Sequence, residues 1–201
     1  MNDDTLIDDV LEFWFGELDH AGMPAEDRNK LWFQASESTD SEIRHQFGDA
    51  VEAAVAGQLD HWSAGTQGLA ALIVLLDQFT RNIYRGTASA FAGDDGALAL
   101  ARGAVASGTD RNMPAIHRVF LYIPFEHAED LAAQEQGIAR FDALLDDCHP
   151  DAREAVEGFR RYMVAHRDVV AQFGRFPHRN SILGRASTAD EQAHLDKHGG
   201  F

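Results

Sequence analysis

One predicted helix changes from apolar to polar side chains along its length. It is the segment 69–86, LAALIVLLDQFTRNIYRG. At about 100° per residue, five polar side chains fall within one sector of roughly 140°. They are Asp77, Gln78, Arg81, Asn82 and Arg85. Guanidinium groups bind carboxylates and phosphates through paired donors, so this stripe suits an anionic ligand. The alternative is that the helix simply emerges into solvent here, with Asp77 and Arg81 forming an i,i+4 pair.

A second group of titratable side chains follows a proline in the segment 120–130, FLYIPFEHAED. Pro124 is expected to kink or end its helix, because the ring displaces a backbone hydrogen bond. His127 and Glu129 follow directly, and a histidine beside carboxylates can act as a general base oriented by an acid. The alternative is a structural histidine at a helix junction. We take His127, Glu129 and His178 as the candidate catalytic residues.

The third candidate is the segment 173–185, FGRFPHRNSILGR, which carries three arginines, one histidine and no acid in a chain of net charge −16. Gly174, Pro177 and Gly184 predict irregular backbone, so the segment should be a loop. The predicted ligand-binding side chains in it are Arg175, His178, Arg179, Asn180 and Arg185. Either these arginines face an anionic ligand, or they pair with carboxylates of the protein itself.

Motifs of familiar catalytic and cofactor sites do not occur. The sequence contains no GxSxG, P-loop, dinucleotide-binding or HExxH pattern. His194 and His198 lie four residues apart, but no third ligand with suitable spacing accompanies them. We therefore expect no metal and no cofactor.

The elements that must position these residues are predicted to be helices throughout. Helical periodicity recurs along the chain, and no run shows the alternation of a strand. Capping boxes are predicted at 39–42 and 188–191, and Asp4 or Thr5 is expected to cap the first helix. We expect an all-α fold of antiparallel helix pairs, about seven to nine helices and no sheet. The helices should cover about 6–15, 31–33, 43–59, 66–85, 97–107, 114–124, 128–147, 151–172 and 189–198.

Composition limits the partners and the setting of the protein. The 201 residues contain no linker-like stretch, so one domain over residues 1–201 is expected. Thirty-three acids against seventeen bases disfavour nucleic acid and anionic membranes. The longest apolar run, 69–76, is too short to span a bilayer, and the acidic N-terminus does not resemble a signal peptide. The single Cys148 fits a reducing compartment, and together these features predict a cytoplasmic protein.

Four segments together resemble the bacterial family called domain of unknown function 924. They are VLEFWFGEL, LDQFTRNIYRG, FLYIPFEHAED and FGRFPHRNSILGRAST. The resemblance implies an all-helical fold grouped with tetratricopeptide-like proteins, and it implies no established reaction. Its motif positions fall on Asp77, Gln78, Phe79, Arg81, Asn82, Pro124, His127, Glu129, 174–180, Gly184 and Arg185. This chain has Thr80 where the family usually has proline and Ala128 where it usually has serine, which counts against a serine mechanism.

We expect the three segments to converge on one cleft lined by arginine and histidine. The predicted partner is a small carboxylate or phosphate compound, or the carboxylate of a peptide end. One alternative is a tetratricopeptide-like interaction module, with an exposed groove formed by Trp14, Phe15, Trp32 and Trp62. A second alternative is a hydrolase-like enzyme that uses a His/Glu acid–base pair. The sequence does not indicate the oligomeric state.

Overall fold

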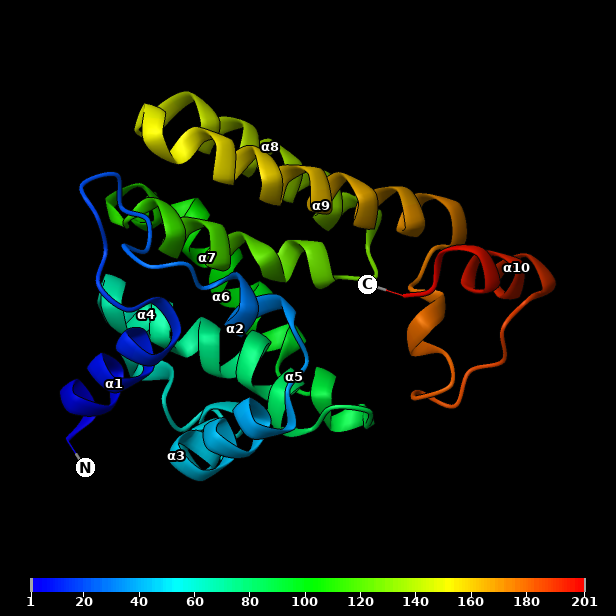
Figure 1. Ribbon diagram of the computed structural model, residues 1–201, viewed down its shortest axis with the longest axis horizontal. Helices are drawn as coiled ribbons and strands as arrows, with labels where there is room; N and C mark the ends of the chain where they lie inside the picture. Colours follow the sequence, from blue (N-terminus) through cyan, green and yellow to red (C-terminus); the bar gives the residue numbers. More distant parts are fainter. Residues whose placement is uncertain (1, 201) are drawn as a thin grey trace.

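The computed structural model describes residues 2–200, and its regular elements in that range are all helical (Figure 1). The predicted all-helical fold is confirmed, since residues 2–200 contain no strand and only one isolated bridge, between Leu18 and Pro24. No helix in the same range is both long enough and apolar enough to cross a membrane. The α-helices are α1 (Asp3–Phe15), α2 (Asn29–Phe33), α3 (Glu37–Val55), α4 (Thr66–Ile73), α5 (Thr80–Ile83), α6 (Asp94–Ser107), α7 (Ala115–His127), α8 (Leu131–Asp147), α9 (Arg153–Phe173) and α10 (Ala189–His198).

The predicted third long helix contains a π-helical turn. The α4 helix continues through the π segment η2 (Val74–Phe79) directly into α5, so residues 66–83 form one continuous helix. Counted in this way, the described residues form nine continuous helices. Thr80 permits this continuity, and its hydroxyl donates to the carbonyl of Leu76 at 2.7 Å. This continuous helix ends at Ile83 rather than at Arg85, where the sequence predicted its end. Widened π turns often occur at functional sites, and this one carries Asp77.

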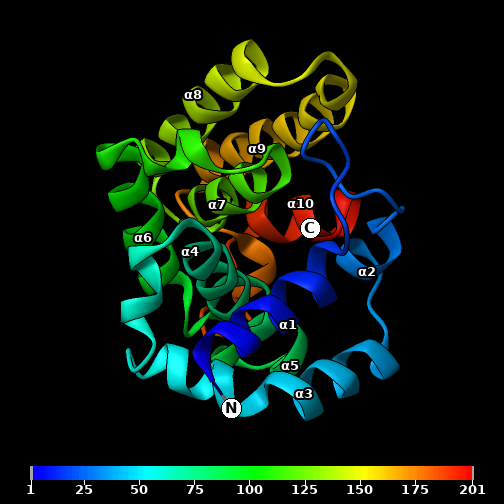
Figure 2. The same cartoon turned by 90° about the vertical axis from the view of Figure 1, so that its left-hand side faces the viewer.

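The helices are arranged in layers around α4 and α7 (Figures 1 and 2). The α8 and α9 helices pair at one end of the molecule, while α1 and α3 cover the opposite end. The α4 helix and residues 115–126 of α7 are buried nearly all round, as expected of an apolar central helix. One hydrophobic cluster links residues from α1 through α9. The core therefore holds the ends of η2 and α7 rigidly together.

Helix ends follow the predicted signals in part. Thr188 caps α10 in a complete capping box with Glu191, as predicted, and Gly108 ends α6 with a φ of 76°. The capping box predicted at 39–42 is wrong, because α3 already begins at Glu37 and Ser36 accepts the cap hydrogen bond from the N–H of Thr39. The prediction that Asp4 or Thr5 caps the first helix is also wrong, since α1 begins at Asp3.

The proline in α7 does not end the helix. Pro124 lies inside α7, which continues for three further residues to His127. The following residues leave the helix in an extended conformation, and Asp130 then caps α8 by accepting from the N–H of Ala132 at 3.0 Å. Gln134 donates to the carbonyl of Ala128 at 2.8 Å and to that of Glu126. These bonds satisfy carbonyls that the end of α7 would otherwise leave unpaired in a buried place.

The C-terminal part of the chain forms a separate cap beyond α9 (Figure 1). After Gly174, with a φ of 71°, the chain passes through the short 3-10 helix η6 (Pro177–Arg179) and a loop before α10. Phe176 packs with Val169 and Val170 in a small cluster of its own. This small cluster fixes the root of the loop that carries the third candidate segment.

Candidate functional site

The centre of the site is a buried carboxylate paired with a histidine. Asp77 lies in η2 and is 0% exposed. The Nδ1–H of His127, at the end of α7, donates to Oδ1 of Asp77 at 2.7 Å, and the amide of Gln78 donates to Oδ2 at 2.5 Å. The bond through Nδ1 leaves Nε2 of His127 as the proton acceptor. Two sequence segments that are 50 residues apart are thus joined directly.

The arginine next to this pair is held by a carboxylate of α6. Arg81 donates to the two carboxylate oxygens of Asp94 at 2.8 and 3.1 Å and to the carbonyl of Asp77 at 2.6 Å. Its N–H groups also lie 3.5 Å from the Asp77 carboxylate. The side chain of Arg81 therefore neutralises two acids of its own protein. Its donors are not directed at an empty space, as a free anion-binding group would be.

Arg179 brings the third segment to the same place. Its guanidinium lies between the rings of Phe91 and Phe176, 4.6 Å from each centroid. One terminal nitrogen lies 3.4 Å from Oδ2 of Asp94, a long hydrogen bond. The side chain is only 7% exposed, and within residues 2–200 its Nε has no hydrogen-bond partner. Burial lowers the pKa of Arg179 to about 10, so the guanidinium stays protonated at neutral pH.

Three of these groups, Asp94, His127 and Arg179, border a pocket of about 400 Å³ between the start of α6, the end of α7 and η6. The N-terminus of α6 faces it without a side-chain cap. Its lining residues are Asp94, Asp95, Leu98, Pro124, His127, Ala128, Glu129, Asp130 and Arg179. Arg81 and Arg179 both contact Asp94, and His127 contacts Asp77 beside Arg81. The second and third predicted segments thus both border the pocket, while the polar stripe contacts its lining residues from behind through Asp77 and Arg81.

Burial and opposite charges set the protonation states of the central pair. Burial alone would raise the pKa of Asp77, but His127 and Arg81 lower it to about 2. The pKa of His127 is also lowered, because burial and the charge of Arg81 outweigh the attraction of Asp77. At neutral pH the pair therefore consists of an ionised carboxylate and a neutral imidazole. That combination can accept a proton at Nε2.

A second layer of buried titratable groups lies behind this pair. Burial raises the pKa of Glu126 to about 8, and the repulsion of Asp77 adds to this, so Glu126 keeps its proton at neutral pH. Nδ1 of His166 lies 3.3 Å from Glu126, and burial lowers the pKa of His166 to about 3. Burial likewise lowers the pKa of the predicted residue His178 to about 4. These histidines are neutral.

Four residues at this site were not among the sequence candidates: Phe91, Asp94, Glu126 and His166. Asp94 belongs to the GDDG turn, whose acids are already explained by the start of a helix. Glu126 did carry a signal, because it is the last residue of an otherwise apolar stretch of α7. Phe91 and His166 carry no signal in the sequence, since only tertiary packing places them here.

The predicted polar stripe divides between two faces of the molecule. Asn82 donates to Asp40 of α3 at 2.8 Å, and Arg85 holds the same carboxylate through two bonds of 2.7 and 2.9 Å. Arg85 lies beyond the end of α5, so the helical sector no longer applies to it. Neither Asn82 nor Arg85 borders the pocket described above, and their role in ligand binding stays a prediction.

Much of the third segment is tied to carboxylates of the protein itself. Arg175 donates to both oxygens of Glu191 in α10, at 2.6 and 2.9 Å, and Asn180 bonds to Glu191 and Ser187. Arg185 forms a two-bond pair with Glu129. None of Arg175, Asn180 and Arg185 borders this pocket, and their role in ligand binding stays a prediction.

The predicted His/Glu catalytic pair is replaced by an Asp/His pair. Glu129 borders the pocket, but its carboxylate accepts from Arg185 and from the N–H of Phe176 at 2.7 Å. Burial alone would raise the pKa of Glu129, but Arg185 and the N–H of Phe176 lower it. Glu129 is therefore an ionised anchor for the loop, and Asp77 is the acid that orients His127.

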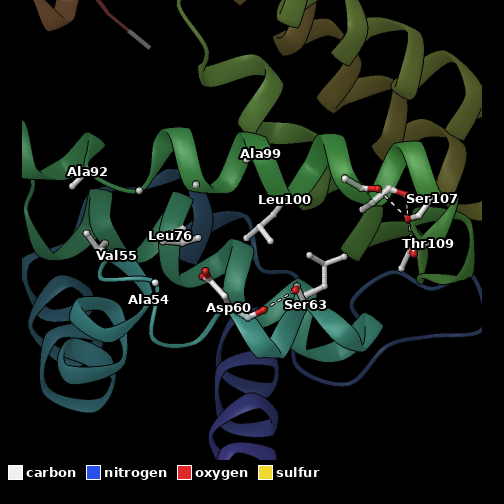
Figure 3. A pocket seen from close by; sticks show the side chains of 16 residues that line it. Ala54, Val55, Asp60, Ser63, Leu76, Ala92, Ala99, Leu100, Ser107 and Thr109 are labelled. Atoms are coloured by element: carbon white, nitrogen blue, oxygen red, sulfur yellow. Dashed lines mark hydrogen bonds between the residues drawn. The ribbon is translucent and has the colours of Figure 1, made fainter.

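A second hollow, of about 600 Å³, extends along α6 from Gly93 to Ser107 (Figure 3). Ala99, Leu100 and Ser107 of α6 border it, together with Asp60 and Ser63. Most of its lining is alanine, glycine and leucine, and no basic side chain faces it. We place the functional site at the smaller pocket, because the charged and titratable groups converge there.

The aromatic groove that the sequence suggested does not form. Trp14, Phe15 and Trp62 are 1%, 1% and 4% exposed, and Trp32 is partly buried with its Nε1–H donating to the carbonyl of Trp14 at 3.0 Å. Within residues 2–200, no group of three metal-binding side chains includes a residue of the pocket, and the His194–His198 pair has no third member there.

These observations define the class of the protein. It is an all-helical protein in which a buried ion-pair cluster opens into a small pocket. The chain belongs to the family described as bacterial protein of unknown function (DUF924), whose model matches residues 10–199.

A solved structure shares this fold. It is described as the structure of a protein of unknown function, ATU0120, from Agrobacterium tumefaciens. The two chains are 35% identical with a TM-score of 0.80, and the match covers 98% of this chain and 99% of that one. The search of curated proteins found no match.

Proposed function

We propose that the pocket between α6, α7 and η6 binds a small anionic compound through Arg179. The observation that carries this proposal is the state of its guanidinium. It has five N–H donors, borders the pocket, and within the described residues donates one long hydrogen bond, to Asp94. A buried cation with unused donors gains most from an anion that completes its bonds.

The N-terminus of α6 supports the same ligand chemistry. The first N–H groups of α6 have no side-chain cap. They point out of the N-terminal end of the helix, which carries the partial positive charge of the helix dipole. Carboxylates and phosphates bind readily at such helix ends. The volume of about 400 Å³ also falls within the range of small-molecule pockets.

The charge balance favours a ligand of low charge. The charges of Arg81 and Arg179 are balanced by those of Asp77 and Asp94, so these four groups give the site no net positive charge. Asp95 and Asp130 add two carboxylates at the edge of the pocket. Both would repel a dianion, so we expect a single carboxylate to bind more tightly than inorganic phosphate.

Thermal unfolding with acetate, lactate and inorganic phosphate tests this proposal. A ligand at about 100 times its Kd should raise the Tm by roughly 5 to 10 °C. In Arg179→Lys we expect a much smaller shift, because lysine lacks the planar fork of donors. Arg175→Lys is the matched control, since this arginine lies in the same segment but bonds to Glu191. Equal shifts in all three proteins would refute a site at Arg179.

A second candidate function, acid–base catalysis, rests on the Asp77–His127 pair. A buried carboxylate that fixes the tautomer of a histidine is the arrangement used by many general bases. Ala128 leaves no hydroxyl beside His127, so a water molecule would have to be the nucleophile. Hydrolysis of carboxylic and phosphoric esters by the wild type should fall by about 10²- to 10⁴-fold in His127→Gln. Activity retained in this variant would exclude His127 as the base.

The interaction-module alternative has less support. The tryptophans assigned to a groove are buried, and the charged pocket is too small to hold a long peptide. Binding of a single terminal carboxylate of a peptide remains compatible with Arg179. We also propose a cytoplasmic location and a tetratricopeptide-like relationship, both on the sequence features described above.

A further inference from the structure

A cluster of two histidines and one aspartate lies far from the pocket, on a different face of the fold. It joins the connection between α1 and α2, which carries His20, to the junction of α8 and α9, which carries His149 and Asp151. In both views the connection lies beside that junction (Figures 1 and 2). Nε2 of His20 and Oδ2 of Asp151 are 3.0 Å apart across 131 residues of sequence.

The geometry of the three side chains suits a divalent transition-metal ion. One ligand atom from each residue lies within 4.8 Å of the others. Nδ1 of His149 is 3.6 Å from Oδ2 of Asp151, and the two imidazole rings meet edge to face at 4.9 Å. In a tetrahedral site, metal–ligand bonds of about 2.0 to 2.2 Å place neighbouring ligand atoms roughly 3.3 to 3.6 Å apart. The two His–Asp distances of 3.0 and 3.6 Å are close to this range. Two imidazoles with one carboxylate are a common donor set for Zn²⁺, Co²⁺ and Ni²⁺.

The backbone holds the two parts of the cluster in place. The carboxylate of Asp19 accepts from the N–H groups of Ala21 and Met23, at 2.8 and 3.0 Å, and so closes the turn that carries His20. On the other side, the N–H of Asp151 donates to Nδ1 of His149 at 3.2 Å, which orients this ring at the start of a 3-10 helix. An ion bound at Nδ1 would replace this long hydrogen bond. Little ordering of the ligands is therefore needed when an ion binds.

We propose that His20, His149 and Asp151 form a binding site for a Zn²⁺-type ion. The ion binds one nitrogen of each histidine and one oxygen of Asp151, and water completes its coordination because all three side chains are exposed. The site links the α1–α2 connection to the α8–α9 junction. It also places a cation among acidic groups of a chain whose net charge is −16.

Calorimetric titration of the tag-free 201-residue protein with Zn²⁺ tests this site, with Co²⁺ absorption as a report on the coordinating atoms. The wild type should bind one equivalent, and its Tm should rise by roughly 5 to 10 °C at about 100 times Kd. His20→Ala and His149→Ala should each weaken binding by at least about tenfold. Both side chains are exposed, so the folded state should survive, as circular dichroism can check.

His61→Ala is the matched control. His61 is another exposed histidine bonded to a carboxylate, Asp3, at 2.6 Å, but it has no second histidine beside it. We expect this variant to bind Zn²⁺ as the wild type does. Absence of stoichiometric binding would overturn the proposal, and so would binding that persists unchanged in His20→Ala and His149→Ala. In either case His20 and Asp151 form a surface ion pair only.

Discussion

The residue on which the site depends most is Asp77. Its carboxylate is fully buried, and it meets His127, Gln78 and Arg81 within hydrogen-bonding or ion-pairing distance. A buried charge of this kind is tolerated only while its partners remain. Asp77 therefore fixes the imidazole of His127 and at the same time stabilises the fold.

Replacing Asp77 with asparagine should destabilise the protein by about 3 kcal/mol, because it leaves the buried Arg81 with one carboxylate fewer. Urea unfolding measures this loss. Asp142→Asn is the control, since it removes the same charge from an exposed pair with Arg160, and we expect little change there. A loss below about 1 kcal/mol in Asp77→Asn would contradict the buried pairing described here.

Glu126 should make stability depend on pH. Burial raises its pKa from 4.5 to about 8, so between these values the folded protein keeps a proton that the unfolded chain releases. The free energy of unfolding contributed by this group therefore falls as pH rises through that window. Glu126→Gln cannot titrate and should lose this contribution.

Urea unfolding of wild type and Glu126→Gln between pH 5 and about 9 checks the sign. The stability of the variant relative to wild type should increase with pH by a few kcal/mol in total. His166 titrates in the opposite sense, but it is present in both proteins and is expected to cancel. If the free energies of unfolding of wild type and Glu126→Gln changed in parallel with pH, Glu126 would be ionised in the folded state, which would contradict this prediction.

At the scale of elements, the sequence predicted the long helices well and their contacts poorly. Apolar periodicity located α6, α8 and α9 to within three residues at each end, because each helix buries one face. The predicted helix 43–59 is α3, which begins six residues earlier and ends four residues earlier. The π turn in η2 was not predicted, since the period of 3.6 residues cannot show one inserted residue. That turn places Asp77 in the core. After it, Arg81 bonds to Asp94 of α6, whereas Asn82 bonds to Asp40 of α3.

The packing of α8 depends on a glycine. A Cβ at Gly137 would lie 2.5 Å from Cε of Met163 and 2.8 Å from Cβ of Phe125. Gly137→Ala should therefore cost about 1 to 3 kcal/mol through overpacking. Gly103→Ala is the matched control, because this helical glycine has no atom within 4 Å of the added Cβ. It should gain up to about 1 kcal/mol from helix propensity.

Urea unfolding of both glycine variants should give changes of opposite sign. Equal stability of Gly137→Ala and wild type would mean that α7 and α9 move apart without cost. The result concerns the element that carries His127, since α8 packs on α7. A loosened α7 would also displace the pocket residues that it carries, Pro124 and His127.

At the scale of the whole molecule, the arginines of this acidic protein are mostly bound to its own acids. Arg81, Arg85, Arg175 and Arg185 each pair with a carboxylate from a distant segment. The sequence indicated which arginines gather near the site. It left open whether they bind a ligand or the protein, because the partners Asp40, Asp94 and Glu191 become neighbours only through helix packing. Arg179 is the one of this group that borders the pocket with unused donors.

Our central proposal is that His127, oriented by Asp77, and Arg179 border one anion-binding pocket. Nitrogen NMR of the histidine and arginine side chains, during titration with acetate and then with inorganic phosphate, tests it most directly. We predict that His127 carries its proton on Nδ1 at neutral pH, and that Nε2 of His127 and Nε of Arg179 shift together with one Kd. A folded protein in which neither anion moves either resonance would contradict this account.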